Sequence, residues 1–179
     1  MALTATIYHV TVELADVDRN VYETVSLRLA RHPSESEEYL ATRLLAYCLE
    51  YAEGIAFSSG LSDPEAPTIA VRDLTGAIRV WIEIGAPDAA RVHKASKASP
   101  RVAVYTHRDV GQLLRQWAGE RIHRADALEL YAFDRAFIGE VAAKLDRRLT
   151  LALSRTGGHL YLTMGDVVLE GAVERIVVP

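Results

Sequence analysis

The chain has 179 residues, half of them apolar, and a formal net charge of −4. This length and composition support one folded domain, which we expect to span residues 1–179. The longest apolar run, Ile78–Ala86, is broken by Arg79 and Glu83 and is far shorter than the roughly 20 residues of a membrane span, which excludes a transmembrane helix. The negative total charge excludes a protein that coats nucleic acid through its overall charge, but it leaves room for a local basic surface.

The first residues, Met1–Tyr8, alternate in a way that favours a strand and lack the basic start and long apolar stretch of a secretory signal. The lone Cys48 lies in an apolar helical pattern, so it has no disulfide partner within the chain and belongs to no cysteine metal motif. We therefore expect a protein of a bacterial-type cytoplasm with a buried core thiol.

The first part of the chain predicts two strands and a helix. Ala5–Leu14 and Thr24–Ala30 alternate between apolar and polar side chains, which is typical of paired strands. Ser34 is an N-cap candidate, and Glu37 three residues later completes a capping box. A helix is therefore predicted from Glu35 to Glu53.

Strands and helices are also predicted to alternate through the rest of the chain, without repeats or linkers. In order, the predicted segments are strands Ile55–Ser58, Thr68–Arg72 and Ile78–Gly85, a helix from Asp88 to Ser99, strand Val102–Thr106, helix Val110–Ala118, strand Leu128–Ala132, helix Phe133–Leu145, and strands Leu149–Ser154, His159–Thr163 and Val167–Glu170. A hairpin turn at Gly76 should make the second and third strands antiparallel, and a helical crossover should make Val102–Thr106 parallel to Ile78–Gly85. The sequence therefore predicts an α/β (α+β) fold that ends in a β meander.

Several familiar catalytic motifs are missing from the sequence. It has no Gly-rich phosphate loop, no nucleophile elbow, no zinc-protease motif and no dinucleotide fingerprint. The six histidines show no metal-ligand spacing. These absences argue against most hydrolase, kinase and oxidoreductase classes.

Charged residues cluster instead around the central strands. Glu65 precedes one predicted strand and Glu83 lies near the end of the next, so both carboxylates could approach one sheet edge and share Mg²⁺ or Mn²⁺. The stretch from Arg91 to Arg108 has five cations and no acid: Arg91, Lys94, Lys97, Arg101 and Arg108. It predicts a local basic surface beside Glu83.

Six segments together resemble signature stretches of the YaeQ family, in the family's order and over nearly the whole chain. They are Leu14–Asn20, Leu29–Glu35 with its Arg-His-Pro-Ser-Glu run, Arg43–Tyr47, Gly60–Ser62, Trp81–Asp88 and Lys94–Ser96. The resemblance implies a compact fold around a PD-(D/E)XK nuclease-like αβββαβ core at about residues 34–106.

In PD-(D/E)XK enzymes two acids bind metal and a lysine follows the second acid. The resemblance maps the acids onto Glu65 and Glu83, and a helical acid onto Glu38, with Glu35 and Glu37 as lesser alternatives. The sequence departs from the pattern, because Pro64-Glu65 replaces Pro-Asp and Gly85 stands where the lysine is expected. We expect Lys94 to replace that lysine, in preference to Lys97.

The leading hypothesis is a metal-dependent phosphodiesterase of nuclease type, a hydrolase acting on nucleic acid. Glu65 and Glu83 would bind Mg²⁺ or Mn²⁺, Lys94 would position water, and Glu38 would assist. Phosphate contacts would come from the cations on and after the second predicted helix, namely Arg91, Lys97 and Arg101.

The simplest alternative for Glu83 is a salt bridge to Arg79 or Lys94. Two rival functions remain open: a nuclease-like module that binds nucleic acid without turnover, and a protein-interaction or regulatory domain. The sequence leaves the choice between enzyme and binding module open.

Overall fold

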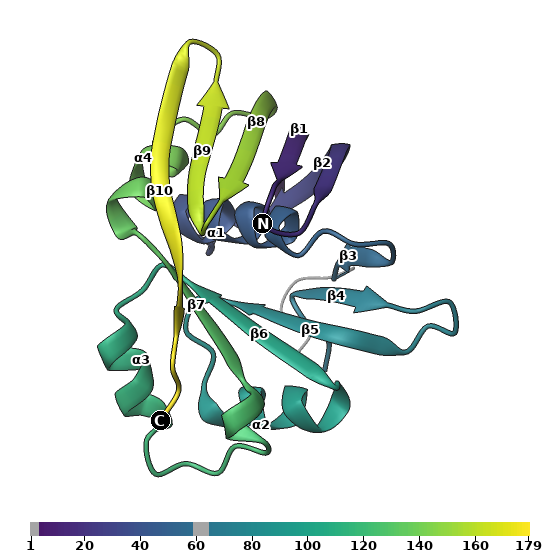
Figure 1. Cartoon of the computed structure of the whole chain (residues 1–179), viewed down its shortest axis with the longest axis vertical. Coiled ribbons are helices and arrows are strands. Elements are labelled where there is room, and N and C mark those ends of the chain that lie inside the picture. Colours follow the sequence, from purple (N-terminus) through teal and green to yellow (C-terminus); the bar gives the residue numbers. More distant parts are fainter. Residues whose placement is uncertain (1–3, 59–64) are drawn as a thin grey trace. The chain divides into compact units, whose positions relative to one another are not determined.

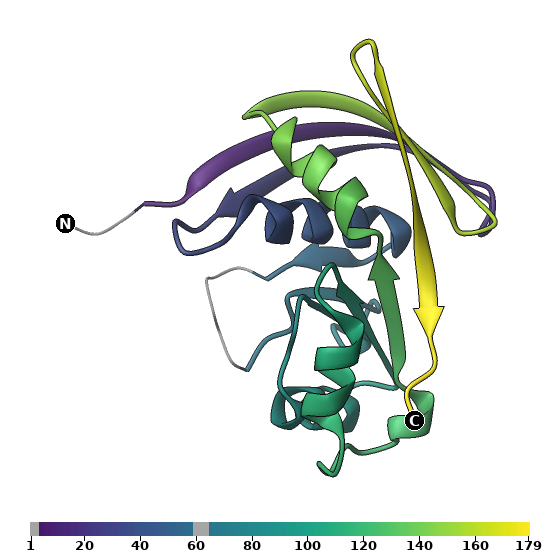
Figure 2. The same ribbon diagram turned by 90° about the vertical axis from the view of Figure 1, so that its left-hand side faces the viewer.

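The computed structural model describes residues 4–58 and 65–179 (Figures 1 and 2). The predicted loop at 60–64, with the Gly60–Ser62 stretch and Pro64, lies outside these residues. Contacts group the chain into two compact units: one runs to Leu49 and resumes at Phe133–Glu174, and the other comprises Glu50–Ala132 and Arg175–Pro179. The expectation of one domain over 1–179 stays a prediction, and each unit is described by itself.

The sheet strands of the first unit lie in the order β2-β1-β8-β9-β10. Its strands are β1 Thr6–Asp16, β2 Val21–Arg31, β8 Arg148–Thr156, β9 His159–Met164 and β10 Val167–Ile176, the last of which leaves this unit after Glu174. The predicted hairpin of β1 and β2 and the meander of β8, β9 and β10 are confirmed as antiparallel pairs. The parallel pairing of β1 with β8 was not predicted.

Two helices cover the apolar face of this sheet, α1 Glu37–Leu49 and α4 Arg135–Ala143. Figure 2 shows both helices on the same side of the curved strands. Gly171 of β10 lies against α4 so closely that a Cβ there would be 2.3 Å from Cγ of Phe137. Alternate residues of β1, such as Val10 and Val12, are buried in this core. The opposite face of the sheet is more exposed and polar.

The predicted start and end of α1 were wrong by a few residues. The cap is Ser36, whose Oγ accepts a hydrogen bond from Tyr39 N at 3.1 Å. Ser34 instead contacts Nδ1 of His32 at 2.5 Å, so it has no part in the helix cap. The helix also ends at Leu49, four residues before the predicted Glu53. A second serine two residues along the chain offered the backbone an equally good N-cap.

The sheet strands of the second unit lie in the order β7-β6-β5-β4-β3. Its elements are β3 Ile55–Phe57, β4 Ile69–Arg72, β5 Ile78–Ile84, α2 Ala89–Ala98, β6 Arg101–Thr106, α3 Val110–Trp117, the short 3₁₀ helix η1 Ala125–Ala127 and β7 Glu129–Phe133. The antiparallel β4–β5 hairpin and the parallel β5–β6 pair are confirmed, and β7 extends the parallel side. A core that includes Trp81, Val92 and Trp117 lies between this sheet and its helices.

The fold is therefore a mixed α+β arrangement whose helix and strand order from α1 to β6 is αβββαβ, as predicted. Contacts place α1 in the first unit, with α4, and the five later elements in the second. The nuclease-like core itself stays a prediction. No helix within residues 4–58 and 65–179 is long and apolar enough to cross a membrane.

Candidate functional site

Glu83, near the end of β5, is a buried carboxylate whose two oxygens both accept hydrogen bonds. Its side chain is only 4% exposed and forms an ion pair with Arg91, with Nε 2.9 Å from Oε2. Trp81 Nε1 donates to Oε1 at 2.6 Å, and the Thr68 hydroxyl donates to Oε2 at 3.2 Å. The ion-pair alternative for Glu83 is thus correct, and the ion pair observed is with Arg91, where the sequence suggested Arg79 or Lys94.

A second ion pair lies on the same helix. Lys94 Nζ contacts the Glu65 carboxylate, and the two side chains are 40% and 74% exposed. Arg91 and Lys94 are three residues apart on α2 and so share a helix face. Arg91 also donates from Nη2 to the carbonyl oxygen of Ala66 at 2.8 Å, which links Glu83 to the residue after Glu65. The structure thus brings Lys94 to Glu65, and Arg91 connects this pair to Glu83.

These contacts decide how well Glu65 and Glu83 fit a shared metal. Each carboxylate has its own cation, and both oxygens of Glu83 already accept hydrogen bonds. A divalent ion would have to displace Arg91 and Lys94 to reach them. Within residues 4–58 and 65–179 no group of three His, Cys, Asp or Glu side chains is placed to hold a metal. The residues as arranged do not fit a two-carboxylate Mg²⁺ site.

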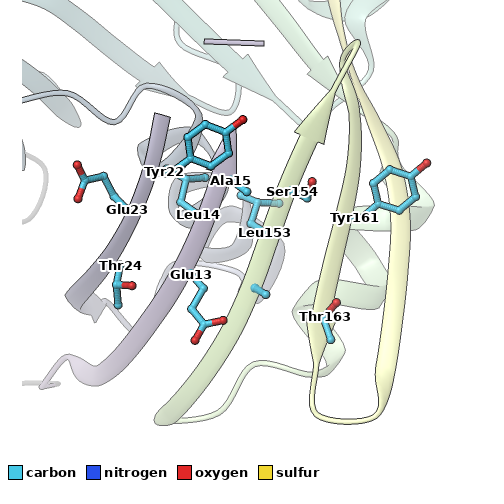
Figure 3. A pocket seen from close by; sticks show the side chains of 11 residues that line it. Glu13, Leu14, Ala15, Tyr22, Glu23, Thr24, Leu153, Ser154, Tyr161 and Thr163 are labelled. Atoms are coloured by element: carbon cyan, nitrogen blue, oxygen red, sulfur yellow. The ribbon is translucent and has the colours of Figure 1, made fainter. Parts of the chain in front are cut away.

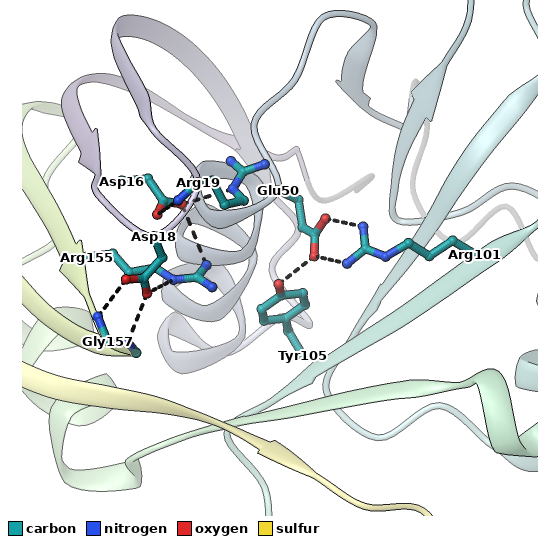
Figure 4. A network of polar contacts seen from close by, with 9 residues as sticks. Asp16, Asp18, Arg19, Glu50, Arg101, Tyr105, Arg155 and Gly157 are labelled. Atoms are coloured by element: carbon teal, nitrogen blue, oxygen red, sulfur yellow. Dashed lines mark hydrogen bonds and ion pairs between the residues drawn. The ribbon is translucent and has the colours of Figure 1, made fainter.

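Arg101, at the start of β6, is engaged with the carboxylates of Glu50 and Glu129, and Figure 4 shows the contact with Glu50. Nη1 and Nη2 donate to Glu50 at 2.7 and 2.9 Å, and Nε donates to Glu129 at 2.6 Å. Burial opposes the charge of Arg101, but the hydrogen bonds to Glu129 and Glu50 raise its pKa above the usual range. Tyr105 donates to Glu50 at 2.6 Å, and burial, with Glu50 beside it, raises the pKa of this phenol. Arg101 therefore has a structural role in the second unit, and its predicted contact with phosphate stays a prediction.

A comparable network closes two turns of the first unit (Figure 4). The fully buried Asp16 forms an ion pair with Arg19 at 3.0 Å. Asp18 accepts hydrogen bonds from the backbone of Gly157 at 2.6 Å and Gly158 at 3.0 Å, and from Arg155 at 3.1 Å. The two backbone donors lower the pKa of Asp18 most. This network ties the β1–β2 turn to the β8–β9 turn and has a structural role.

Five basic side chains form a separate group, which we name the α2 basic cluster: His93, Lys97, Arg121, His123 and Arg124. Desolvation lowers the pKa of His93, and the nearby charges of Lys97, Arg121 and His123 lower it further. Within the part of the chain that the structure describes, none of the five forms an ion pair with a carboxylate.

Hydrogen bonds hold the 121–124 segment of this cluster against α2. His123 N donates to Nδ1 of His93 at 2.9 Å, and the Ser96 hydroxyl donates to the carbonyl oxygen of His123 at 2.5 Å. Arg124 donates from Nη2 to the carbonyl oxygens of Ser96 and Ser99 at 2.9 and 3.0 Å. Sequence reasoning singled out only Lys97 of this cluster as a site residue, because it considered the histidines for metal-ligand spacing alone and ended the basic stretch at Arg108. The signal that was missed is the density of basic residues at 121–124.

The remaining predicted acids lie in the first unit. Glu38 is exposed in the first turn of α1, and its part in the predicted site stays a prediction. Glu37 is exposed beside it, 4.0 Å from Arg31. Glu35 accepts a hydrogen bond from His32 N at 3.1 Å and lies 3.8 Å from Arg43. These contacts give Glu35 and Glu37 local structural roles.

Comparison with known proteins gives consistent results. A family model described as YaeQ protein matches residues 1–173. The chain is 38% identical over 165 residues to the uncharacterized protein YaeQ of Escherichia coli K12, which covers 91% of both chains, and 34% identical to that of Salmonella typhi over 91% of both. The crystal structure of YaeQ protein from Xanthomonas axonopodis pv. citri superposes with a TM-score of 0.88 at 29% identity, covering 98% of this chain and 100% of that one. The Pseudomonas syringae structure gives 0.87 at 28% identity, over 97% and 96%.

Proposed function

The chain belongs to the YaeQ family, and on that premise we propose that it binds nucleic acid through the α2 basic cluster. The observation that carries this proposal is the contrast in charge pairing along α2. Arg91 and Lys94 form ion pairs with carboxylates, whereas Lys97 and the cations of the 121–124 segment form none with any described residue. Cations without carboxylate partners are the ones available to phosphates.

Phosphate recognition suits the chemistry of this cluster. Arg121 and Lys97 are exposed, and each would release a counterion on contact with a phosphate. Nδ1 of His93 accepts from a backbone N–H, so Nε2 carries the hydrogen of the neutral ring, and proton uptake would take place at Nδ1 at the cost of that hydrogen bond. A nearby phosphate would favour the protonated ring, because it would offset the repulsion from Lys97, Arg121 and His123. Contacts of this kind read the backbone and not the sequence.

The predicted nuclease-like core then serves as a binding scaffold. We propose that the pairs Glu83–Arg91 and Glu65–Lys94 stand where a PD-(D/E)XK enzyme holds its metal, and that they keep the carboxylates neutralised. In this proposal Glu83 fixes the start of α2 through Arg91, and α2 presents the basic cluster.

Fluorescence anisotropy with labelled single- and double-stranded DNA and RNA of mixed sequence tests the proposal. The double variant Lys97→Ala/Arg121→Ala should weaken binding to every sequence about equally and reduce the salt slope by about two. The matched control, Lys144→Ala/Arg148→Ala, removes the same charge from exposed positions of the first unit. Failure of the wild type to bind any of these probes at low salt contradicts the proposal, as does an equal loss in the control.

A second candidate, the metal-dependent phosphodiesterase, draws on the contact that brings together Lys94 and Glu65, two of its expected site residues. It requires Glu83 and Glu65 to exchange their cations for Mg²⁺ or Mn²⁺. Calorimetry with each ion and a nuclease assay on the same probes separate the candidates. Metal binding and cleavage by the wild type, both abolished by Glu83→Gln, would identify the protein as an enzyme. If the wild type shows neither, the nucleic-acid-binding function is the candidate that remains.

A further inference from the structure

The outer face of the first unit's sheet carries a groove of about 500 Å³ (Figure 3). Its floor is made of small residues of β1 and β8, among them Ala15 and Ser154. Tyr22 and Tyr161 stand on either side of this floor and remain 57% and 40% exposed. The volume lies in the range of protein ligand sites. None of its lining residues belongs to the α2 basic cluster or to the ion pairs of Glu65 and Glu83.

The groove selects for positive charge by two independent features. Its lining residues include the carboxylates Glu13 and Glu23 but no Lys, Arg or His. Neither carboxylate forms an ion pair with any residue among 4–58 and 65–179. The faces of the two tyrosine rings also attract cations. Both the carboxylates and the tyrosine rings therefore favour an occupant with positively charged groups.

The spacing of the tyrosines favours an extended occupant that carries two cations. Strand pairing puts Tyr22 opposite Ala15, Ala15 opposite Ser154, and Ser154 opposite Tyr161, in one row across four strands. Three interstrand steps place the tyrosine backbones about 14 Å apart. A cation interacts with a ring only within about 6 Å, so an occupant with two cations spaced like the tyrosines matches this row better than a single cation does. Glu170, beside Tyr161 in the same row, adds a carboxylate at that end.

We propose that this groove binds an extended basic segment of a partner protein, with one lysine or arginine at each tyrosine. In an extended chain, residues about four positions apart span this distance. The basic side chains stack on Tyr22 and Tyr161, and Glu13 and Glu23 neutralise them. The small floor residues let the backbone of the segment approach the sheet.

The test uses fluorescein-labelled peptides and the full-length protein in anisotropy titrations. The probe is a short Thr/Val peptide with two arginines about four positions apart, and the matched control has the same composition with adjacent arginines. The spaced peptide should bind about tenfold more tightly than the adjacent one, because only it reaches both rings. Tyr22→Ala or Tyr161→Ala should weaken it about threefold, and Glu13→Gln by a similar factor. Leu74→Ala, at a fully exposed position of the second unit, should leave binding unchanged.

Three outcomes overturn the proposal. Equal affinity for the spaced and adjacent peptides, or no loss in the tyrosine variants, removes the groove as the binding site. Free arginine or spermidine that competes with the peptide mole for mole identifies a small cationic ligand as the occupant. Self-association of the wild type that Tyr22→Ala abolishes identifies a second copy of the chain instead.

Discussion

Two charge clusters of the second unit use arginine and lysine in opposite ways. Around Arg101 each donor on the guanidinium meets a carboxylate, and the phenols of Tyr105 and Tyr131 complete the network. Around His93, basic side chains gather with no described carboxylate in an ion pair. The first arrangement stabilises the fold, and the second is available to a ligand. The density of charged residues in the sequence did not distinguish the Arg101 network from the α2 basic cluster. The difference depends on which acidic side chains pack against which basic ones in the folded chain.

The largest expected effect comes from breaking the Arg101 network. Glu50→Ala removes a 6% exposed carboxylate and leaves Arg101 and Tyr105 without a partner they now share. Loss of one member of a buried ion pair typically costs about 3 to 5 kcal/mol of unfolding free energy. Urea unfolding measures this loss, and Glu53→Ala, an exposed glutamate three residues on, is the control. A loss below about 1 kcal/mol would show that the ion pair of Arg101 with Glu129 is enough to stabilise this network without Glu50.

A smaller loss of unfolding free energy is expected at Glu83. Like Glu50 it is a buried carboxylate in an ion pair, but its partner Arg91 lies on α2, the helix of the basic cluster. Glu83→Gln removes the charge that Arg91 binds, while the amide keeps an acceptor for Trp81. We expect a loss of about 1 to 3 kcal/mol in unfolding free energy. In a double-mutant cycle with Arg91→Gln, a positive coupling energy would confirm that the pair acts through this contact, and additive losses would contradict it.

Removing cations from the α2 basic cluster should not lower the unfolding free energy. Lys97→Ala/Arg121→Ala removes exposed cations, so its unfolding free energy should stay within about 0.5 kcal/mol of wild type or rise slightly. Its affinity for nucleic acid should nevertheless fall. Thermal unfolding and anisotropy on the same samples compare the two quantities. A clear loss of stability would mean that Lys97 or Arg121 stabilises the fold through a partner. That result would contradict the difference drawn between this cluster and Arg101.

The smallest effect concerns pH. The pKa of His93 is lowered in the folded chain, so between that value and the unfolded value of about 6.5 the unfolded state binds more protons. This contribution to stability is therefore present above the unfolded pKa and is lost as pH falls through the folded pKa. A bound oligonucleotide should raise the pKa of His93, because its phosphates offset the repulsion. Histidine NMR titration with and without oligonucleotide measures the change, and an unchanged pKa would separate His93 from the binding surface.

The sequence predicted the local structure well because periodicity and turn residues act locally. Both hairpins, the parallel β5–β6 pair and the αβββαβ order follow from such signals. Asp88 caps α2 as the predicted start implies, with Arg91 N donating at 2.8 Å. The β1–β8 pair was missed because no local signal joins strands so far apart in the chain.

The candidate site was predicted less completely than the fold. The contact between Lys94 and Glu65 agrees with the expectation that both belong to one site, whereas the roles expected of them there stay predictions. The partner of Glu83 was not identified, because Arg91 and Lys94 lie on one helix face and only packing chooses between them. Glu50 was assigned to a helix that ends one residue earlier, so its buried pairing with Arg101 had no sequence signal.

The pairing of β1 with β8 has a consequence for the order of events during synthesis. His9 pairs with Arg148, so this ladder cannot form until nearly the whole chain has left the ribosome. Residues 50–132, by contrast, form most of the second unit without a break in sequence. Contacts between distant residues form slowly, since closing the intervening loop costs entropy first. We therefore expect residues 50–132 to acquire structure while the chain is still being made. Until β8 has been made, β1 and β2 can pair only with each other, as a hairpin.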